Sequence, residues 1–250
     1  MIDNRKLNDY GKEKGRIMYC FKSRVRFSET DKNKKLTLPA IVDYFQDCST
    51  FQTEDLGVGF SYLEPKGLTW VLSYWQIIIE EYPNLGEEIT IGTLPYDFKS
   101  FLGRRNFFME KEGKMIVKGD SLWTLLDLKQ MRPVKVPEEL LKTYQKEEKL
   151  TMEYAPRKIA ISGEEKIEEP LIVQRHHLDC NGHVNNGQYI KMAAGYLPNN
   201  FRVRQIRAEY KNQAYMGDVI YPRCYQEDGK YMVVLYNETI QPYVIMEYKE

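Results

Sequence analysis

Hydrophobic and polar residues alternate strictly near the start of the chain, in the segment FKSRVRF at 21–27. Phe21, Val25 and Phe27 fall on one face and the basic side chains on the other, which is typical of a half-buried strand. Beyond this segment the apolar positions recur every three or four residues. The pattern therefore predicts a strand followed by a helix.

The predicted helix runs from about Thr37 toward Leu56. Thr37 is expected to cap its N-terminus, because a threonine oxygen can accept one of the free N–H groups there, and Gly57 is expected to end it. The stripe that should face a core consists of Leu38, Ile41, Val42, Phe45, Cys48, Ser49 and Gln52.

Extended, aromatic-rich segments separated by turn signals follow the helix, at 69–79, 87–96, 104–113 and 114–128. A second round begins near residue 170 with a strand PLIVQRH, a loop, a helix from about Asn185 to Tyr196 and further strands. Between the rounds, charged residues and prolines predict a linker with one short helix. We expect an α+β protein with a polar tail (1–15), an N-terminal domain (16–130), the linker (131–169) and a C-terminal domain (170–250).

The two rounds match at the loop before each helix. Asp31, Asn33, Lys35 and Thr37 have the same spacing as Asp179, Asn181, His183 and Asn185, each 148 residues later (179 − 31). Because the order strand, D-x-N loop, capped helix and strands also recurs, the chain is predicted to contain two copies of one α+β unit.

Charge and cysteine content narrow the classes of function. The chain has 36 basic and 36 acidic residues, so no overall field directs it toward nucleic acid or a membrane. Its longest apolar run, Tyr231 to Tyr236, is far short of the roughly 18 residues of a membrane span, and its polar first residues do not resemble a signal peptide. Four scattered cysteines suit reduced thiols, and we expect a cytoplasmic protein.

All three histidines lie in RHHLDCNGHVNN, Arg175 to Asn186. If this segment is extended, Asp179, Asn181 and His183 face the same way, directly before a helix N-terminus. A histidine can accept a proton, a carboxylate can orient it, an amide can hold a carbonyl or a water, and free helix N–H groups can bind an oxyanion. This set suits the addition of water to an acyl carbonyl.

Other interpretations of the loop compete with this one. Because Asp31 and Asn33 stand at the equivalent positions without a histidine, Asp179 and Asn181 can also have a purely structural role. Cys180 is out of phase with the groups that would activate it, and no G-x-S-x-G motif is present. A metal site is disfavoured, because adjacent strand residues point to opposite faces; its ligands would be His176, His177, Cys180 and His183. We expect neither metal nor cofactor.

Six blocks of the sequence resemble, in order and over nearly the whole chain, the acyl-ACP thioesterases, plant and bacterial enzymes that release fatty acids from acyl carrier protein. The blocks are VRFSETD, DLGVG, WVLSYWQIIIEEYP, GRRNFF, SLWTLLDLKQMRPVKVP and LDCNGHVNNGQYI. The resemblance implies two tandem hotdog domains, each an antiparallel sheet wrapped around a long central helix. It also implies chain termination in fatty acid biosynthesis as the function.

The family motif D-x-N-x-H-V-N-N falls on this loop, so the resemblance implies catalytic roles for Asp179, Asn181 and His183. Plant members carry a Glu-Cys pair after the strand E-Y, where this chain has Gln213 and Ala214. This departure excludes a mechanism that needs the cysteine and favours a water nucleophile, which Gln213 can position by hydrogen bonds. We expect His183 or Asp179 as the general base, with the helix start at Asn185, Asn186 and Gly187 polarising the carbonyl.

The resemblance further implies an apolar tunnel for the acyl chain in the N-terminal domain. Candidates are Phe45, Trp70, Leu72 and Trp75, with Phe51 and Tyr74, although each can equally be core packing. An acidic carrier needs a basic surface, for which the candidates are Lys22, Arg24, Arg26, Arg104, Arg105, Arg202, Arg204, Arg207 and Lys211. A homodimer is left open.

Two other functions remain. A different hotdog enzyme, an acyl-CoA thioesterase or an acyl dehydratase, would share the capped helix and the acyl pocket. A non-catalytic module that binds acyl carrier protein is the other alternative, because Gln213 and Ala214 replace two reactive side chains.

Overall fold

The computed structural model describes residues 18–227 and 229–250, so the tail predicted at 1–15 lies outside the described residues. The chain forms two compact units, which we call the N-terminal unit (residues 18–71 and 81–152) and the C-terminal unit (residues 72–80 and 153–250). Every strand pair described in either unit is antiparallel, and each unit has a helix packed on its sheet. The predicted α+β class is therefore confirmed.

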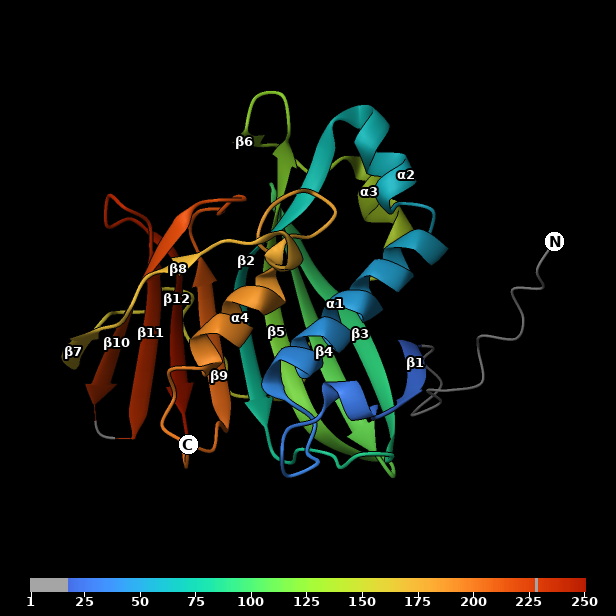
Figure 1. The fold of residues 1–250 in the computed structure, drawn as a ribbon. Helices are drawn as coiled ribbons and strands as arrows, with labels where there is room; N and C mark the ends of the chain where they lie inside the picture. Colours follow the sequence, from blue (N-terminus) through green and yellow to red (C-terminus); the bar gives the residue numbers. More distant parts are fainter. Residues whose placement is uncertain (1–17, 228) are drawn as a thin grey trace. The chain divides into compact units, whose positions relative to one another are not determined.

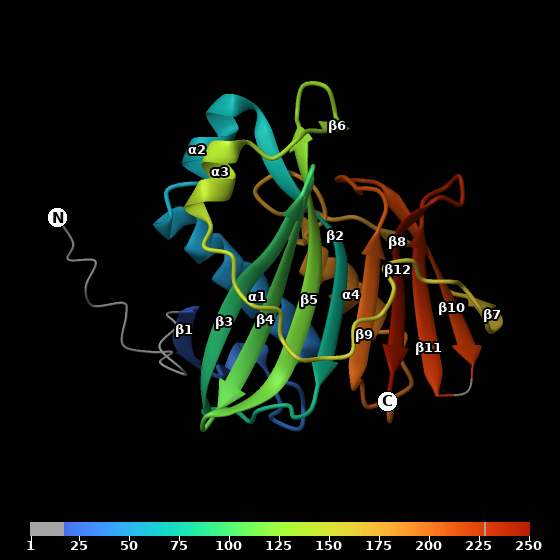
Figure 2. The same ribbon diagram turned by 180° about the vertical axis from the view of Figure 1, so that it is seen from behind.

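The N-terminal unit has the strand order β1-β3-β4-β5, with β6 paired to β5. Figure 1 shows helix α1 crossing this sheet, and Figure 2 shows the strands from the opposite side. The strands are β1 (Tyr19–Arg24), β3 (Glu88–Lys99), β4 (Leu102–Lys111), β5 (Lys114–Asp127) and β6 (Arg132–Pro133). The helical elements are η1 (Phe27–Glu29), α1 (Leu38–Asp55), α2 (Phe60–Leu63), η2 (Glu64–Lys66) and α3 (Glu138–Thr143).

Helix α1 confirms the predicted stripe, because all seven of its residues are buried. Thr37 is its N-cap and accepts the Ala40 N–H at 3.4 Å. Gly57 follows the helix with φ +69°, a conformation that favours glycine. The expected burial of Phe27 is wrong: strand β1 ends at Arg24, and Phe27 is 83% exposed in the turn η1.

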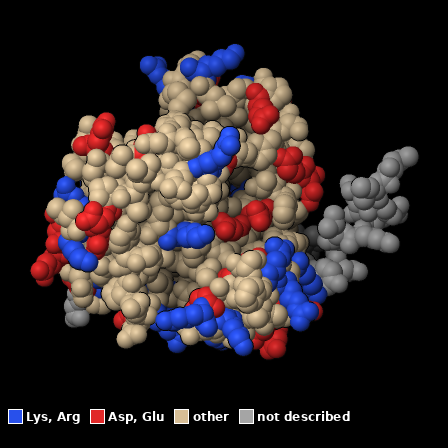
Figure 3. Space-filling view, viewed as in Figure 1, with Lys and Arg blue, Asp and Glu red and all other residues tan. Residues whose placement is uncertain are grey.

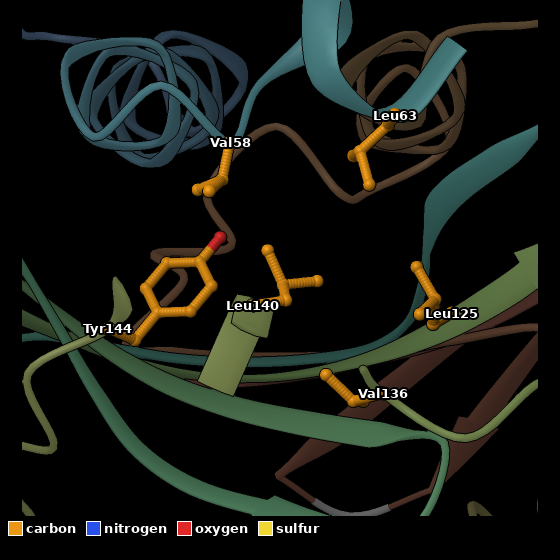
Figure 4. Packing of buried hydrophobic residues seen from close by; sticks show 6 residues of the cluster. All are labelled: Val58, Leu63, Leu125, Val136, Leu140 and Tyr144. Atoms are coloured by element: carbon orange, nitrogen blue, oxygen red, sulfur yellow. The ribbon is translucent and has the colours of Figure 1, made fainter. Parts of the chain in front are cut away.

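Helices α2 and α3 pack over an apolar cluster in the N-terminal unit (Figure 4). The cluster consists of Val58, Leu63, Leu125, Val136, Leu140 and Tyr144. Its last three members come from the segment predicted to be a linker, and Ile159 from the same segment packs in the core of the C-terminal unit. The few apolar residues of this segment are thus used for packing, and within the segment the boundary between the units falls between residues 152 and 153.

The C-terminal unit has the strand order β2-β9-β12-β11-β10-β7, with β8 paired to β10. Helix α4 (Asn186–Ala194) packs against β11 and β12. The strands are β2 (Leu68–Ile79), whose first residues belong to the N-terminal unit, β7 (Glu164–Ile167), β8 (Leu171–Ile172), β9 (Gln205–Tyr210), β10 (Val219–Glu227), β11 (Lys230–Tyr236) and β12 (Pro242–Lys249). The predicted strand PLIVQRH is too long, because Arg175–His177 form the 3-10 turn η3.

The backbone repeats itself before the two long helices. The turns η1 and η3 start 148 residues apart (175 − 27), and each is followed by an isolated bridge, Thr30 with Leu36 and Leu178 with Val184. The Asp31 N–H donates to the Lys35 carbonyl and the Asp179 N–H to the His183 carbonyl, both at 2.9 Å. The duplication read from the sequence is therefore present in the hydrogen bonds.

Replacing Thr37 by Ala removes the oxygen that caps α1 and is expected to lower the free energy of unfolding by about 1 kcal/mol. Denaturant unfolding measures the change. Thr50→Ala in the middle of the same helix is the control, because alanine there has the higher helix propensity and no cap is lost. Equal stabilities of the two variants would contradict the assigned cap.

Candidate active site

The loop from Asp179 to His183 is a closed turn, not an extended segment. The Asp179 N–H donates to the His183 carbonyl at 2.9 Å, and the Gly182 N–H donates to the Asp179 carbonyl at 3.1 Å. Gly182 has φ +79°, which a glycine adopts without strain. The argument that residues two apart share a face is therefore wrong here. The turn instead makes Asp179 and His183 a backbone pair, with the exposed Asn181 near its tip.

The Asp179 carboxylate holds this turn together. Its Oδ1 accepts the Asn181 backbone N–H at 2.8 Å. In the first copy, Asp31 Oδ1 accepts the N–H groups of Asn33 at 2.8 Å and Lys35 at 2.9 Å. A structural role for the aspartate is thus common to both copies, whatever chemistry the second copy adds.

His183 is half-buried beside the loop that joins β9 to β10. It forms an isolated bridge with Tyr215, and the two rings lie edge to face with centroids 5.3 Å apart. The Tyr215 hydroxyl lies 3.5 Å from Gln213 Oε1. The structure therefore brings Gln213 toward His183 through Tyr215, a residue that the sequence analysis missed. Its only signal in the sequence is its place two residues after Gln213.

Two tyrosines and an aspartate fix the β9–β10 loop. The Tyr189 hydroxyl accepts the Ala214 N–H at 2.9 Å, while Asp218 Oδ2 accepts the Tyr215 N–H at 2.8 Å and the Tyr243 hydroxyl at 3.2 Å. Burial raises the pKa of Tyr189, and burial together with Asp218 raises the pKa of Tyr243 to about 12. Both phenols are therefore neutral near pH 7 and serve as fixed hydrogen-bonding groups.

One backbone N–H group in the first turn of α4 is already bonded to the side chain that caps the helix. Asn185 is the N-cap, and its side-chain oxygen accepts the Gly187 N–H at 2.7 Å. The Asn186 carbonyl accepts the Tyr210 hydroxyl at 3.0 Å. Gly187, expected to polarise a carbonyl, therefore already donates its N–H to the protein, because an N-cap side chain satisfies the donors of the first turn.

The remaining histidines belong to the turn η3. The rings of His176 and His177 lie 4.1 Å apart, so the expectation that they point to opposite faces of a strand is wrong. His177 Nδ1 accepts the Gln174 N–H at 3.0 Å, and burial, followed by the charges of His176 and Lys191, lowers the pKa of His177. Across residues 18–227 and 229–250, no three His, Cys, Asp or Glu side chains are grouped as metal ligands.

The residues expected to bind the acyl chain lie mostly in the core. Phe45 and Trp75 have no exposed surface and Leu72 is 3% exposed, whereas Trp70 is half-buried beside Phe98. Phe45 and Trp70 belong to the N-terminal unit, and Leu72 and Trp75 to the C-terminal unit. The residues are thus divided between the two units.

Two of the arginines expected at a docking surface are buried. Arg105 is 7% exposed and donates to Gln52 Oε1, and Arg207 is 7% exposed and pairs with Glu247 at 3.0 Å. Both expectations are wrong, because these side chains are part of the packed interior. Figure 3 shows acidic and basic side chains mixed over one face of the molecule.

Within the described part of the chain, no helix is long and apolar enough to cross a membrane.

Comparisons with known proteins identify the family of this chain. Residues 17–144 match the acyl-ACP thioesterase N-terminal domain, and residues 160–242 match the C-terminal domain. A dodecanoyl-[acyl-carrier-protein] hydrolase, chloroplastic, from Cinnamomum camphora is 21% identical over 218 residues, which are 78% of this chain and 56% of that protein. The chain spans about half the length of the curated relatives it matches.

Two solved structures share the fold. An acyl-ACP thioesterase from Bacteroides thetaiotaomicron has a TM-score of 0.84 at 22% identity, covering 92% of this chain and 96% of that one. The 12:0-ACP thioesterase from Umbellularia californica has a TM-score of 0.80 at 15% identity, covering 93% and 96%. Because the two domain models together match most of its residues, the chain belongs to the acyl-ACP thioesterase family.

Proposed function

We propose that this chain hydrolyses fatty acyl thioesters of acyl carrier protein to the free fatty acid and the carrier thiol, as a chain-terminating step of fatty acid biosynthesis. The observation that carries the proposal is the pairing of Asp179 and His183 across a closed turn beside Gln213, in a member of this family. We also propose that each unit is a hotdog domain. The packing of one helix on the antiparallel strands of each unit, α1 in the N-terminal unit and α4 in the C-terminal unit, supports this.

In the proposed reaction, His183 removes a proton from a water molecule as the water oxygen attacks the thioester carbonyl carbon. The tetrahedral intermediate then collapses, its carbon–sulfur bond breaks, and the imidazolium returns the proton to the thiolate. Water supplies the second oxygen of the carboxylic acid. No covalent acyl-enzyme is needed, which fits a site where Gln213 and Ala214 stand at the positions of the plant Glu-Cys pair.

The neighbours of His183 have separate tasks in this proposal. Asp179 uses Oδ1 for the turn, and we assign to its Oδ2 the orientation of the imidazole. Asn181, exposed near the tip of the turn, donates its side-chain N–H to the thioester oxygen. Asp179 acting itself as the base is the alternative within the same mechanism. Gly187 takes no part unless Asn185 releases its N–H.

The acyl chain and the carrier need surfaces of opposite character. We propose that apolar side chains of the N-terminal unit, with Phe45 of α1 and Trp70 of β2 among them, accept the acyl chain after a local opening of the core, since Phe45 has no exposed surface. The carrier is acidic, so its docking site should be basic and close to the loop. The exposed Arg175, in the turn η3 before the loop, meets both conditions. Nothing in this assignment requires a homodimer.

His183→Ala is expected to lower kcat for thiol release from acyl carrier thioesters by about 10²-fold or more, because the general base is lost. Lys35→Ala, the same truncation at the equivalent position of the first copy, should leave kcat within about twofold. Thiol release is followed with a chromogenic disulfide, and thermal unfolding checks both folds. If His183→Ala kept most of its activity, the general base would have to be reassigned.

Arg175→Glu is expected to raise KM for acyl carrier substrates by about tenfold and to weaken its salt dependence, because an attractive charge becomes repulsive. The matched control is Arg202→Glu. Arg202 is exposed at the opposite end of β9 from the Gln213 loop, and the six residues of β9 span about 20 Å. Equal effects of the two substitutions on KM would remove Arg175 as a docking residue.

A further inference from the structure

The turn beside the candidate active site has a counterpart in the first copy. Lys35 forms an isolated bridge with Asn84, as His183 does with Tyr215. The Leu36 N–H donates to the Pro83 carbonyl at 2.9 Å, and the Val184 N–H donates to the Ala214 carbonyl at the same distance. The two copies therefore hold the same pair of backbone segments side by side.

The turns at residues 84–87 and 215–218 are closed by the same pair of hydrogen bonds. Glu87 accepts the Asn84 N–H at 2.7 Å and returns its own N–H to the Asn84 carbonyl, with Gly86 at φ +83° between them. Asp218 bonds Tyr215 in the same way, with Gly217 at φ +87°. Because the first copy forms this turn with an asparagine, the turn itself does not require the Tyr215 side chain.

Three of the side chains that differ between the copies lie at this pair of segments. The first copy has Lys35, Tyr82 and Asn84, where the second has His183, Gln213 and Tyr215. In the second copy these three side chains lie next to one another, because the Tyr215 ring packs on the His183 ring and its hydroxyl lies 3.5 Å from Gln213 Oε1. Tyr215 is also 48% exposed, which a residue kept for core packing would not be.

We propose that Tyr215 is a positioning residue for the hydrolysis: it fixes the His183 ring by edge-to-face packing and holds Gln213 so that its amide N–H₂ group serves as a donor to the thioester oxygen. The inference rests on the proposed function and assigns Gln213 to oxyanion stabilisation instead of water activation. An amide has one acceptor oxygen and one N–H₂ group, so a tyrosine hydroxyl that donates to Oε1 leaves the N–H₂ side for the substrate.

The nearby backbone N–H groups are already used, so Gln213 adds a second side-chain donor beside Asn181. The Gly187 N–H donates to Asn185 and the Ala214 N–H donates to Tyr189, so neither is available to an oxyanion as the loop stands. Removing one donor from an oxyanion hole typically lowers kcat by about 10²- to 10³-fold. The hydroxyl–amide distance of 3.5 Å is long for a hydrogen bond, and such contacts commonly tighten when substrate binds.

Tyr215→Phe removes the hydroxyl and keeps the ring. We expect it to lower kcat about tenfold with KM for the carrier substrate within about twofold, because the contact acts on the transition state. In a Gln213→Ala background the same substitution should have no further effect, since the hydroxyl acts through Gln213. Unchanged kcat in Tyr215→Phe, or losses that multiply in the double variant, would overturn the proposal.

Gln213→Glu tests whether the side chain at position 213 acts as a hydrogen-bond donor or as an acceptor. A carboxylate can accept a hydrogen bond from the Tyr215 hydroxyl but offers no N–H, so Gln213→Glu should lose as much kcat as Gln213→Ala. Full activity of Gln213→Glu would overturn the donor role. Tyr225→Phe is the matched control, because Tyr225 donates to Glu165 Oε1 at 2.6 Å elsewhere in the C-terminal unit, and its loss should leave kcat unchanged.

Wild-type chain and His183→Ala accompany every assay, with thermal unfolding of each variant. An active wild type that loses activity in His183→Ala, together with an unaffected Tyr215→Phe, would overturn the role of Tyr215 alone. A wild type that releases no thiol would overturn the proposed function, and the role of Tyr215 with it.

Discussion

The backbone pair between Asp179 and His183 is the constraint on which the candidate site depends. A single N–H to carbonyl bond of 2.9 Å closes a five-residue turn directly before α4. It places a carboxylate and an imidazole at neighbouring points of the backbone and presents Asn181 at the tip. The geometry of the candidate site is therefore built by local hydrogen bonds, and the sheet only has to hold the β9–β10 loop against the turn.

Duplication explains why such a site could arise without a new fold. The first copy has the same turn, the same bond from the asparagine N–H to the aspartate and the same neighbouring loop, but carries Lys35 and Asn84 where the second has His183 and Tyr215. Because the same backbone forms with either set of side chains, the residues that stabilise the fold are different from those assigned to the chemistry. In the proposed function the copies have different roles, and the N-terminal unit provides the apolar side chains for the acyl chain.

The sequence predicts the elements with local signals well. Helix α1 and its cap at Thr37 follow from apolar period and residue type, and the long strands follow from their aromatic and branched residues. Packing of 131–169 was missed because four buried side chains, Val136, Leu140, Tyr144 and Ile159, are scattered among charges. A search for periodic patterns cannot show that isolated apolar residues will be buried by tertiary contacts.

The candidate site was predicted in part. The motif identified Asp179, Asn181 and His183, but the geometry inferred for them assumed an extended chain, whereas Gly182 turns it. Tyr215 could not be found from the loop itself, because its contact with His183 is tertiary and spans 32 residues (215 − 183). Residues joined only by tertiary contact leave no local pattern in a single sequence.

The intact mass of acyl carrier protein after incubation with this chain distinguishes hydrolysis from the two alternative functions. Hydrolysis predicts that the carrier loses the full mass of its acyl group, and that in ¹⁸O-labelled water the released fatty acid gains one labelled oxygen. A carrier that keeps its acyl group, or that loses only the mass of one water molecule, would rule out hydrolysis. The first result would point to a binding module and the second to a dehydratase.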